Sequence, residues 1–215
     1  MIRTFVAFAT AALALSTVGC QSAIAPPVQA PQAGVAKDVA APGCVRIQRG
    51  VRGDVSDTRI AARWPDASYG AEAVAFSGHA GGGERHMLVG FDLGSIPKNA
   101  VISRAALTLR KTAGMGSELA VHRVTAPWSE GTATFRGLES GWDHAPEQVT
   151  KLETNEGDAP VTVDITAAVS GWVSGAEVNR GVLLSADDGM AFATSEALDE
   201  QDRPRLEVCF SLPGA

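Results

Sequence analysis

Two short polar segments of this 215-residue sequence place aromatic rings next to carboxylates. Trp64 is followed closely by Asp66 and Tyr69, and Trp142 is followed directly by Asp143. Flat aromatic rings pack against the C–H faces of sugar rings, while fixed carboxylates accept hydrogen bonds from hydroxyl groups. Both segments have the composition of surface loops, where binding residues are common. The pattern predicts carbohydrate binding by these five residues, and the alternative is that both tryptophans are structural.

A second pair of acidic residues suggests a different chemistry. Asp54 and Asp57 flank the start of a predicted strand, and converging carboxylate oxygens are the ligands that calcium prefers. The spacing does not match an EF-hand loop. We therefore expect no cofactor, with calcium at Asp54 and Asp57 as the alternative.

The sequence lacks the usual patterns of catalytic and zinc-binding residues. No Gly-x-Ser-x-Gly pentapeptide is present, so a nucleophile of the α/β-hydrolase type is not expected. The four histidines, His79, His86, His122 and His144, have neither the helical spacing nor the cysteine partners of a zinc site. We expect His86 and His122 to lie on a sheet surface, and we expect the protein not to be an enzyme.

The charge balance argues against nucleic-acid binding. The chain has 18 Lys and Arg against 24 Asp and Glu, for a formal net charge of −6. A surface that meets phosphates needs a basic face. No nucleic-acid partner is therefore expected.

The N-terminus has the features of an export signal. Arg3 precedes an uncharged, mainly apolar stretch that is too short to span a bilayer and ends at Gly19-Cys20. This end resembles a bacterial lipobox, except that Thr17 stands where Leu is usual. Residues 1–20 are predicted to be a signal peptide with Cys20 as the lipidation site; the alternative is a plain secreted protein. Residues 21–43, rich in Ala and Pro, are predicted to be a disordered tether.

Two further cysteines fit an exported protein. Cys44 and Cys209 remain once Cys20 is assigned to the lipid, and an even number in an exported chain suggests a disulfide. Both lie at the ends of the predicted folded domain, residues 44–215, and the ends of a domain often lie close together. We expect them to be bonded; the alternative is two separate buried thiols.

Short strands with period-two alternation dominate residues 44–215. They predict an all-β fold, an antiparallel β-sandwich with one short helix near residues 165–173, closed by Gly175 and with Trp172 in the core. The expected strands cover residues 45–51, 58–63, 73–76, 87–91, 103–110, 119–124, 161–165, 181–185, 191–194 and 205–210.

Several fragments in order along residues 54–210 resemble the DNRLRE domain, which overlaps carbohydrate-binding module family 96 and the disaggregatase-related repeats. Trp128-Ser129-Glu130-Gly131-Thr132 is similar to the family's "WSEGT" signature, and Trp128 is expected to pack beneath a loop. Gly90 and Phe135 depart from the pattern, since Arg and Trp are usual there. The other matching fragments are Asp57-Thr58, Tyr69-Gly70, residues 87–93 with Ile96-Pro97, residues 105–109, residues 163–166 with Val169, Trp172, Gly175, Asn179 and Gly181, and Phe192, Ser195, Glu196 and residues 203–206.

The resemblance implies a jelly-roll sandwich of the kind found on exported proteins, often attached to enzymes that act on polysaccharides. We therefore expect an extracytoplasmic, membrane-anchored or secreted, non-catalytic module whose partner is a polysaccharide or cell-envelope glycan, with the membrane contacted only through the lipid anchor. The alternatives are a structural or adhesion protein that binds no sugar and, third, a polysaccharide-active enzyme.

Overall fold

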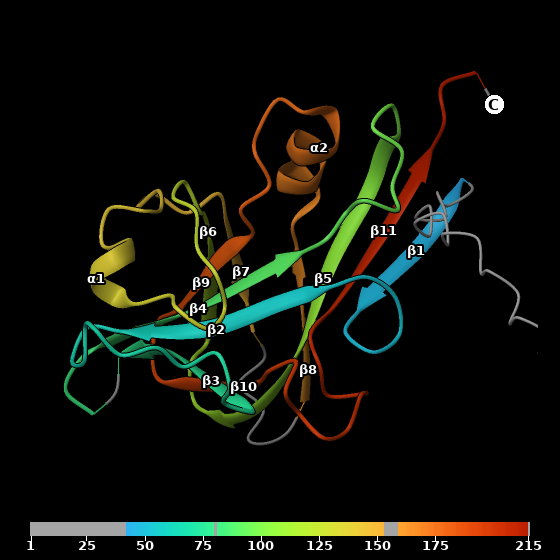
Figure 1. Cartoon of the computed structure of the whole chain (residues 1–215). Coiled ribbons are helices and arrows are strands. Elements are labelled where there is room, and N and C mark those ends of the chain that lie inside the picture. The colour runs from blue at the N-terminus through green and yellow to red at the C-terminus, as the bar shows by residue number, and fades with distance from the viewer. Residues whose placement is uncertain (1–41, 80, 153–158, 215) are drawn as a thin grey trace, which may run out of the picture. The chain divides into compact units, whose positions relative to one another are not determined.

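The chain folds into antiparallel strands arranged in two packed sheets (Figure 1). The computed structural model describes residues 42–79, 81–152 and 159–214. The predicted signal peptide, Cys20 and the tether up to residue 41 lie outside the described residues. The predicted all-β antiparallel sandwich is confirmed.

The two sheets share one strand. The strands are β1 (Gly43–Gln48), β2 (Val55–Ala61), β3 (Val74–His79), β4 (Glu84–Phe91), β5 (Val101–Gly114), β6 (Glu118–Arg123), β7 (Gln148–Lys151), β8 (Ala159–Asp164), β9 (Val182–Ala186), β10 (Met190–Ala193) and β11 (Arg205–Ser211). In the first sheet, β5 pairs with β8 on one edge and with β11 and β10 along the other, and β1 pairs with β11. The second sheet has the order β2-β4-β9-β6-β7. β3 pairs with β10 and then with β4, and so joins the two sheets.

The main core lies between the sheets. Side chains alternate between the two faces of a strand, so Met87 and Val89 of β4 belong to this core together with Leu107 of β5 and Val208 of β11. The register fixes this arrangement, since a shift by one residue would exchange the two faces.

The second sheet is covered on its outer face as well. Leu88 of β4 and Leu183 of β9 point away from the main core into a second apolar cluster, which includes Trp142 and Leu138. The segment between β6 and β7, with the short helix α1 (Phe135–Leu138), supplies this cover. Because both faces are buried, β4 and β9 read as continuous apolar runs rather than as alternating ones.

The prediction of a single helix is wrong, because α1 is present in addition to α2 (Thr166–Ser174). A helix of four residues has no periodic pattern that would reveal it. The predicted α2 is confirmed: Trp172 is buried in the main core, and Gly175 ends the helix with a φ of 76°. No helix within the described residues is long and apolar enough to span a membrane.

The predicted disulfide between Cys44 and Cys209 is confirmed. The two cysteines lie opposite each other in the β1–β11 pair, near the two ends of the folded domain. The bond therefore joins strands that are 165 residues apart in the chain.

Candidate functional site

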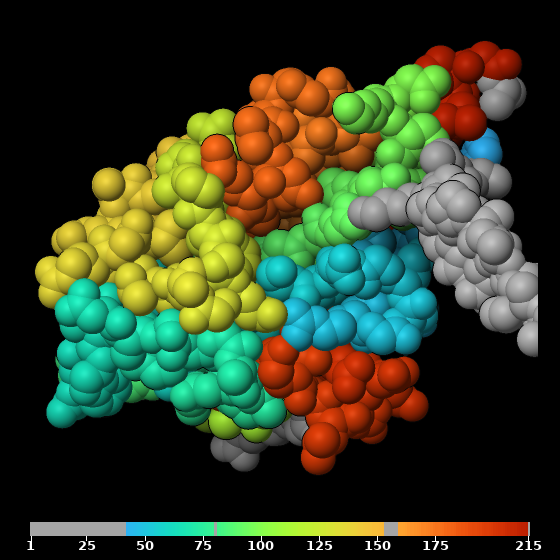
Figure 2. Space-filling view, viewed as in Figure 1, coloured from blue at the N-terminus to red at the C-terminus, as the bar shows by residue number. Residues whose placement is uncertain are grey.

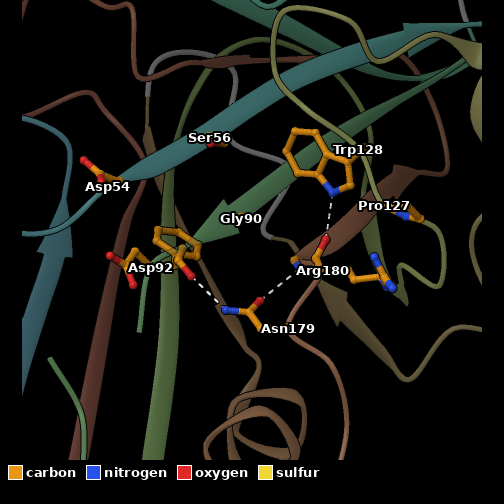
Figure 3. Close-up of a pocket in the computed structure, with 10 residues that line it drawn as sticks. Asp54, Ser56, Gly90, Asp92, Pro127, Trp128, Asn179 and Arg180 are labelled. Carbon is orange, nitrogen blue, oxygen red and sulfur yellow. Dashed lines mark hydrogen bonds between the residues drawn. The ribbon is translucent and has the colours of Figure 1, made fainter. Parts of the chain in front are cut away.

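A surface hollow of about 290 Å³ lies beside Trp128, in the loop between β6 and α1 (Figure 3). Its lining combines the half-buried Trp128 and the buried Phe91 with carboxylate, amide and guanidinium groups. The residues that line it are Asp54, Ser56, Gly90, Phe91, Asp92, Pro127, Trp128, Asn179, Arg180 and Gly181. An apolar wall with a few fixed polar groups is the usual composition of a small-molecule site.

Hydrogen bonds hold the turn before β9 as one wall of this hollow. The indole Nε1–H of Trp128 donates to the carbonyl oxygen of Arg180 at 2.7 Å, and the Asn179 side-chain amide donates to the carbonyl oxygen of Phe91 at 2.8 Å (Figure 3). Gly181 has a φ of 72°, and a Cβ there would lie 2.3 Å from the carbonyl oxygen of Val89. Only glycine allows the turn to approach β4 so closely.

Gly90 of β4 leaves space within the hollow. A Cβ at this position would lie 3.4 Å from the indole of Trp128, which is an ordinary contact distance. The backbone there thus tolerates a side chain, and a long one such as that of Arg would project toward the Trp128 ring. The hollow therefore exists partly because residue 90 is Gly and not the Arg that is usual at this position.

The loop between β2 and β3 presents the first group of predicted sugar-binding residues. Trp64 is 50 % exposed, and the guanidinium of Arg63 lies 5.0 Å from the centre of its ring. The ring of Tyr69 is covered by the guanidinium of Arg59 at 3.9 Å. Of these two aromatic residues, Trp64 is the one whose ring is largely open to solvent.

Asp66 in the same loop forms an ion pair with Arg136 of α1. The carboxylate accepts hydrogen bonds from Nε at 2.6 Å and from Nη2 at 3.1 Å. The hydrogen bonds from Arg136 hold the pKa of Asp66 below its usual range. The backbone N–H of Arg136 also donates to Pro65, so α1 and the loop that carries Trp64 lie side by side.

The two calcium candidates lie in different surroundings. Asp54 is exposed and lines the hollow, whereas the side chain of Asp57 is fully buried. Burial raises the pKa of Asp57 to about 7, although the backbone N–H of Ser195 donates to the carboxylate at 2.9 Å. The partners that could form a cation site with Asp57 are Glu130 and Glu196, not Asp54.

The family model of carbohydrate-binding module family 96 matches residues 53–209. The chain belongs to this family. A comparison with curated proteins gives no match. The matched span includes the hollow, the loop with Trp64 and the three clustered carboxylates.

Trp142 of this family 96 domain does not offer an open ring face. It is 7 % exposed and packs against His86 at 5.3 Å, Phe135 at 6.2 Å and His144 at 5.5 Å between ring centres. The indole is part of the second apolar cluster, through which the segment between β6 and β7 packs on the outer face of the second sheet. In this structure, Trp142 therefore contacts the protein's own rings.

Asp143 lies in an ion-pair network beside Trp142. Its Oδ2 accepts hydrogen bonds from Nε and Nη2 of Arg123 at 2.8 and 2.6 Å. Arg123 also donates to Glu177 at 3.0 Å. The structure thus separates the five predicted binding residues into a Trp64 group and a Trp142 group, on the loops after β2 and after α1.

The expectation that His86 and His122 lie on a sheet surface is wrong. They are only 2 % and 8 % exposed, because the segment that follows β6 covers the outer face of the second sheet. Burial lowers the pKa of His86 to about 4. Strand alternation correctly assigns both histidines to the outer face of the second sheet of this family 96 domain. It does not reveal that the segment between β6 and β7 covers this face.

The sequence reasoning missed Trp128 as a site residue. Its expected position beneath a loop is only partly correct, since the half-buried side chain also lines the hollow. The small residue at position 90 was the available signal, because it removes a side chain next to a signature tryptophan of the family.

Proposed function

We propose that this domain binds a polysaccharide without cleaving it and that the hollow beside Trp128 is the main binding site. The observation that carries this proposal is the lining of the hollow, where the half-buried Trp128 ring lies near the polar groups of Asn179 and Arg180. A ring that can contact sugar C–H faces and polar groups that can bind hydroxyls are both present. Membership in carbohydrate-binding module family 96 supports the same class of ligand.

The exposed ring of Trp64 provides a second contact in this proposal. A polysaccharide is longer than one hollow, and an open aromatic ring can hold a further sugar unit of the same chain. Asp66, oriented by Arg136, and Tyr69, covered by Arg59, supply polar groups on the same loop. Trp142 and Asp143 contribute indirectly, by supporting the segment that carries α1.

Retention on insoluble polysaccharides tests the two contacts separately. Gly90→Arg places a long side chain beside Trp128, and we expect it to reduce retention strongly. The double variant Gly90→Arg, Trp64→Ala should be retained less than Gly90→Arg alone. Val101→Arg is the matched control for the added charge, because Val101 is 56 % exposed on the other sheet. Leu198→Ala is the matched control for the loss of an exposed apolar side chain.

Each outcome of this experiment has a defined meaning. Unchanged retention of both Gly90→Arg and Trp64→Ala would contradict the site assignment. No retention of the wild-type protein on any polysaccharide of a broad panel would contradict the function and favour a structural or adhesion role. Release of soluble sugar from a bound polysaccharide would contradict the non-catalytic role.

We also propose that the protein is extracytoplasmic and anchored through a lipid at Cys20. A disulfide that joins the two ends of the domain suits an oxidising compartment. Precursor processing that is sensitive to globomycin in the wild type and absent in Cys20→Ala would support the anchor. Normal processing of Cys20→Ala would favour the plain secreted protein instead.

A further inference from the structure

Three carboxylates from distant parts of the chain meet at the outer edge of β2. One oxygen each from Asp57, Glu130 and Glu196 lies within 4.8 Å of the others. Asp57 is in β2, Glu130 is in the β6–α1 loop, and Glu196 is in the β10–β11 loop. The fold thus brings residues from both sheets to one cluster.

One arginine balances part of this charge. Arg49, in the turn after β1, donates through Nη2 to both oxygens of Glu130, at 2.7 and 2.8 Å, and through Nη1 to Oε1 of Glu196. Its Nε and Nη2 also donate to the carbonyl oxygen of Val55. When all three carboxylates are ionised, as they would be on a cation, the single guanidinium leaves two negative charges on a cluster of one buried aspartate and two half-buried glutamates.

One buried oxygen of Asp57 has no hydrogen-bond partner within the part of the chain that the structure describes. Oδ2 accepts from the backbone N–H of Ser195, but Oδ1 accepts from no group, and the residue is 0 % exposed. An unpaired buried carboxylate oxygen is costly, because its hydration is lost and nothing replaces it. Oε2 of Glu196 accepts a long hydrogen bond of 3.4 Å from the hydroxyl of Ser195.

We propose that Asp57, Glu130 and Glu196 bind a calcium ion. Calcium takes oxygen ligands at about 2.3–2.6 Å, so two oxygens on the same ion can be up to about 5 Å apart, as these are. A divalent ion neutralises the two excess charges and gives Oδ1 of Asp57 a partner. Magnesium requires shorter distances and a strict octahedron, and it fits this looser set less well.

The ion would join β2 and the β10–β11 loop to the β6–α1 loop, which carries Trp128 of the proposed polysaccharide site. Figure 2 shows the segment containing β2, in blue to cyan, between the loop after β6 in yellow and the β10–β11 loop in red. Glu130 lies two residues after Trp128 in the first of these loops. Calcium at this position would hold the loop that carries Trp128, but the cation site does not depend on sugar binding.

Isothermal titration of calcium chloride into the metal-free protein, without sugar and at constant ionic strength, tests the proposal. A range of about 0.1 to 10 mM brackets the affinities of extracellular calcium modules. We expect a saturable heat in the wild type and its loss in Asp57→Asn and Glu196→Gln. Glu200→Gln is the matched control, since Glu200 is in the same loop as Glu196 but is exposed and outside the cluster.

The same titration separates the alternatives. No saturable heat in the wild type would overturn the proposal and leave Arg49 as the counter-ion of the cluster among the described residues. Equal heats in the wild type and in both cluster variants would place the ion elsewhere. An equal response to magnesium chloride would overturn the assignment to calcium. Glu196→Gln gives a second test if Asp57→Asn does not fold, which circular dichroism would reveal.

Discussion

The indole nitrogen of Trp128 is hydrogen-bonded to the carbonyl oxygen of Arg180 at 2.7 Å, although 52 residues separate them in the chain. This bond connects the β6–α1 loop to the turn that precedes β9. Both segments line the hollow, so the bond fixes the distance between two of its walls. Trp128 therefore has a structural role as well as the proposed binding role.

The first prediction follows from this bond. Trp128→Phe keeps an aromatic ring but removes the donor, and we expect the free energy of unfolding to fall by roughly 1–2 kcal/mol, from the lost hydrogen bond and the smaller buried area. Urea unfolding measures the change. Trp64→Phe is the matched control, since this exposed ring should change stability very little. Equal effects of the two substitutions would show that the bond to Arg180 contributes nothing.

The second prediction concerns the disulfide. A bond that closes a loop of 165 residues restricts the unfolded chain, and in the chain-entropy model this contributes about 5 kcal/mol. We expect a reducing agent to lower the unfolding midpoint of the wild type. The double variant Cys44→Ser, Cys209→Ser should unfold at the lower midpoint whether or not the reducing agent is present. A reduced wild type as stable as the oxidised one would contradict the prediction.

Local patterns predicted the framework of the fold because strand alternation is encoded within a few residues. The ten predicted strands are all present, and the helix that ends at Gly175 is present as well. The missed strand β7 is short, and most of its side chains are exposed, so it carries no apolar pattern. The helix α1 was missed for a similar reason, since only Leu138 is buried in it.

The candidate site was harder to predict because it depends on contacts between distant segments. Trp142 lies in a polar stretch that resembles an exposed loop, yet the outer face of the second sheet buries it. Asp57 was singled out with its neighbour Asp54, but the carboxylates that cluster with it are 73 and 139 positions further along the chain. Spacing along the sequence does not reveal such partners.

The third prediction distinguishes a structural from a binding role for Trp142. The indole fills a buried space among His86, Phe135 and His144, and a large-to-small substitution at such a position typically costs about 3–5 kcal/mol. Trp142→Ala should therefore lower stability by this amount. We expect Trp142→Phe, which fills most of the space, to retain polysaccharide binding. Loss of binding in Trp142→Phe without loss of stability would assign the residue to the site.

The fourth prediction concerns pH and rests on the surroundings of His86. The ring is buried, and the Glu84 carboxylate lies 3.1 Å from Nε2, while Nδ1 has no hydrogen-bond partner within the described residues. Burial lowers the pKa of His86 to about 4; Glu84 raises it in part, and the nearby His122 and His79 lower it further. The native state therefore keeps this ring neutral under mildly acidic conditions.

The unfolded chain takes up a proton at His86 near pH 6.5, whereas the native state does so only near pH 4. The unfolded state thus binds more protons in this window, and the His86 contribution to stability falls as the pH decreases from about 6.5 to 4, by at most about 3 kcal/mol. Asp57 acts in the opposite direction, because its raised pKa favours the native state at lower pH. Urea unfolding of the wild type and of His86→Phe at a series of pH values isolates the histidine, since Asp57 contributes equally to both. We expect the stability of His86→Phe relative to the wild type to rise as the pH falls from about 6.5 to 4, and a constant difference would contradict a neutral, buried His86.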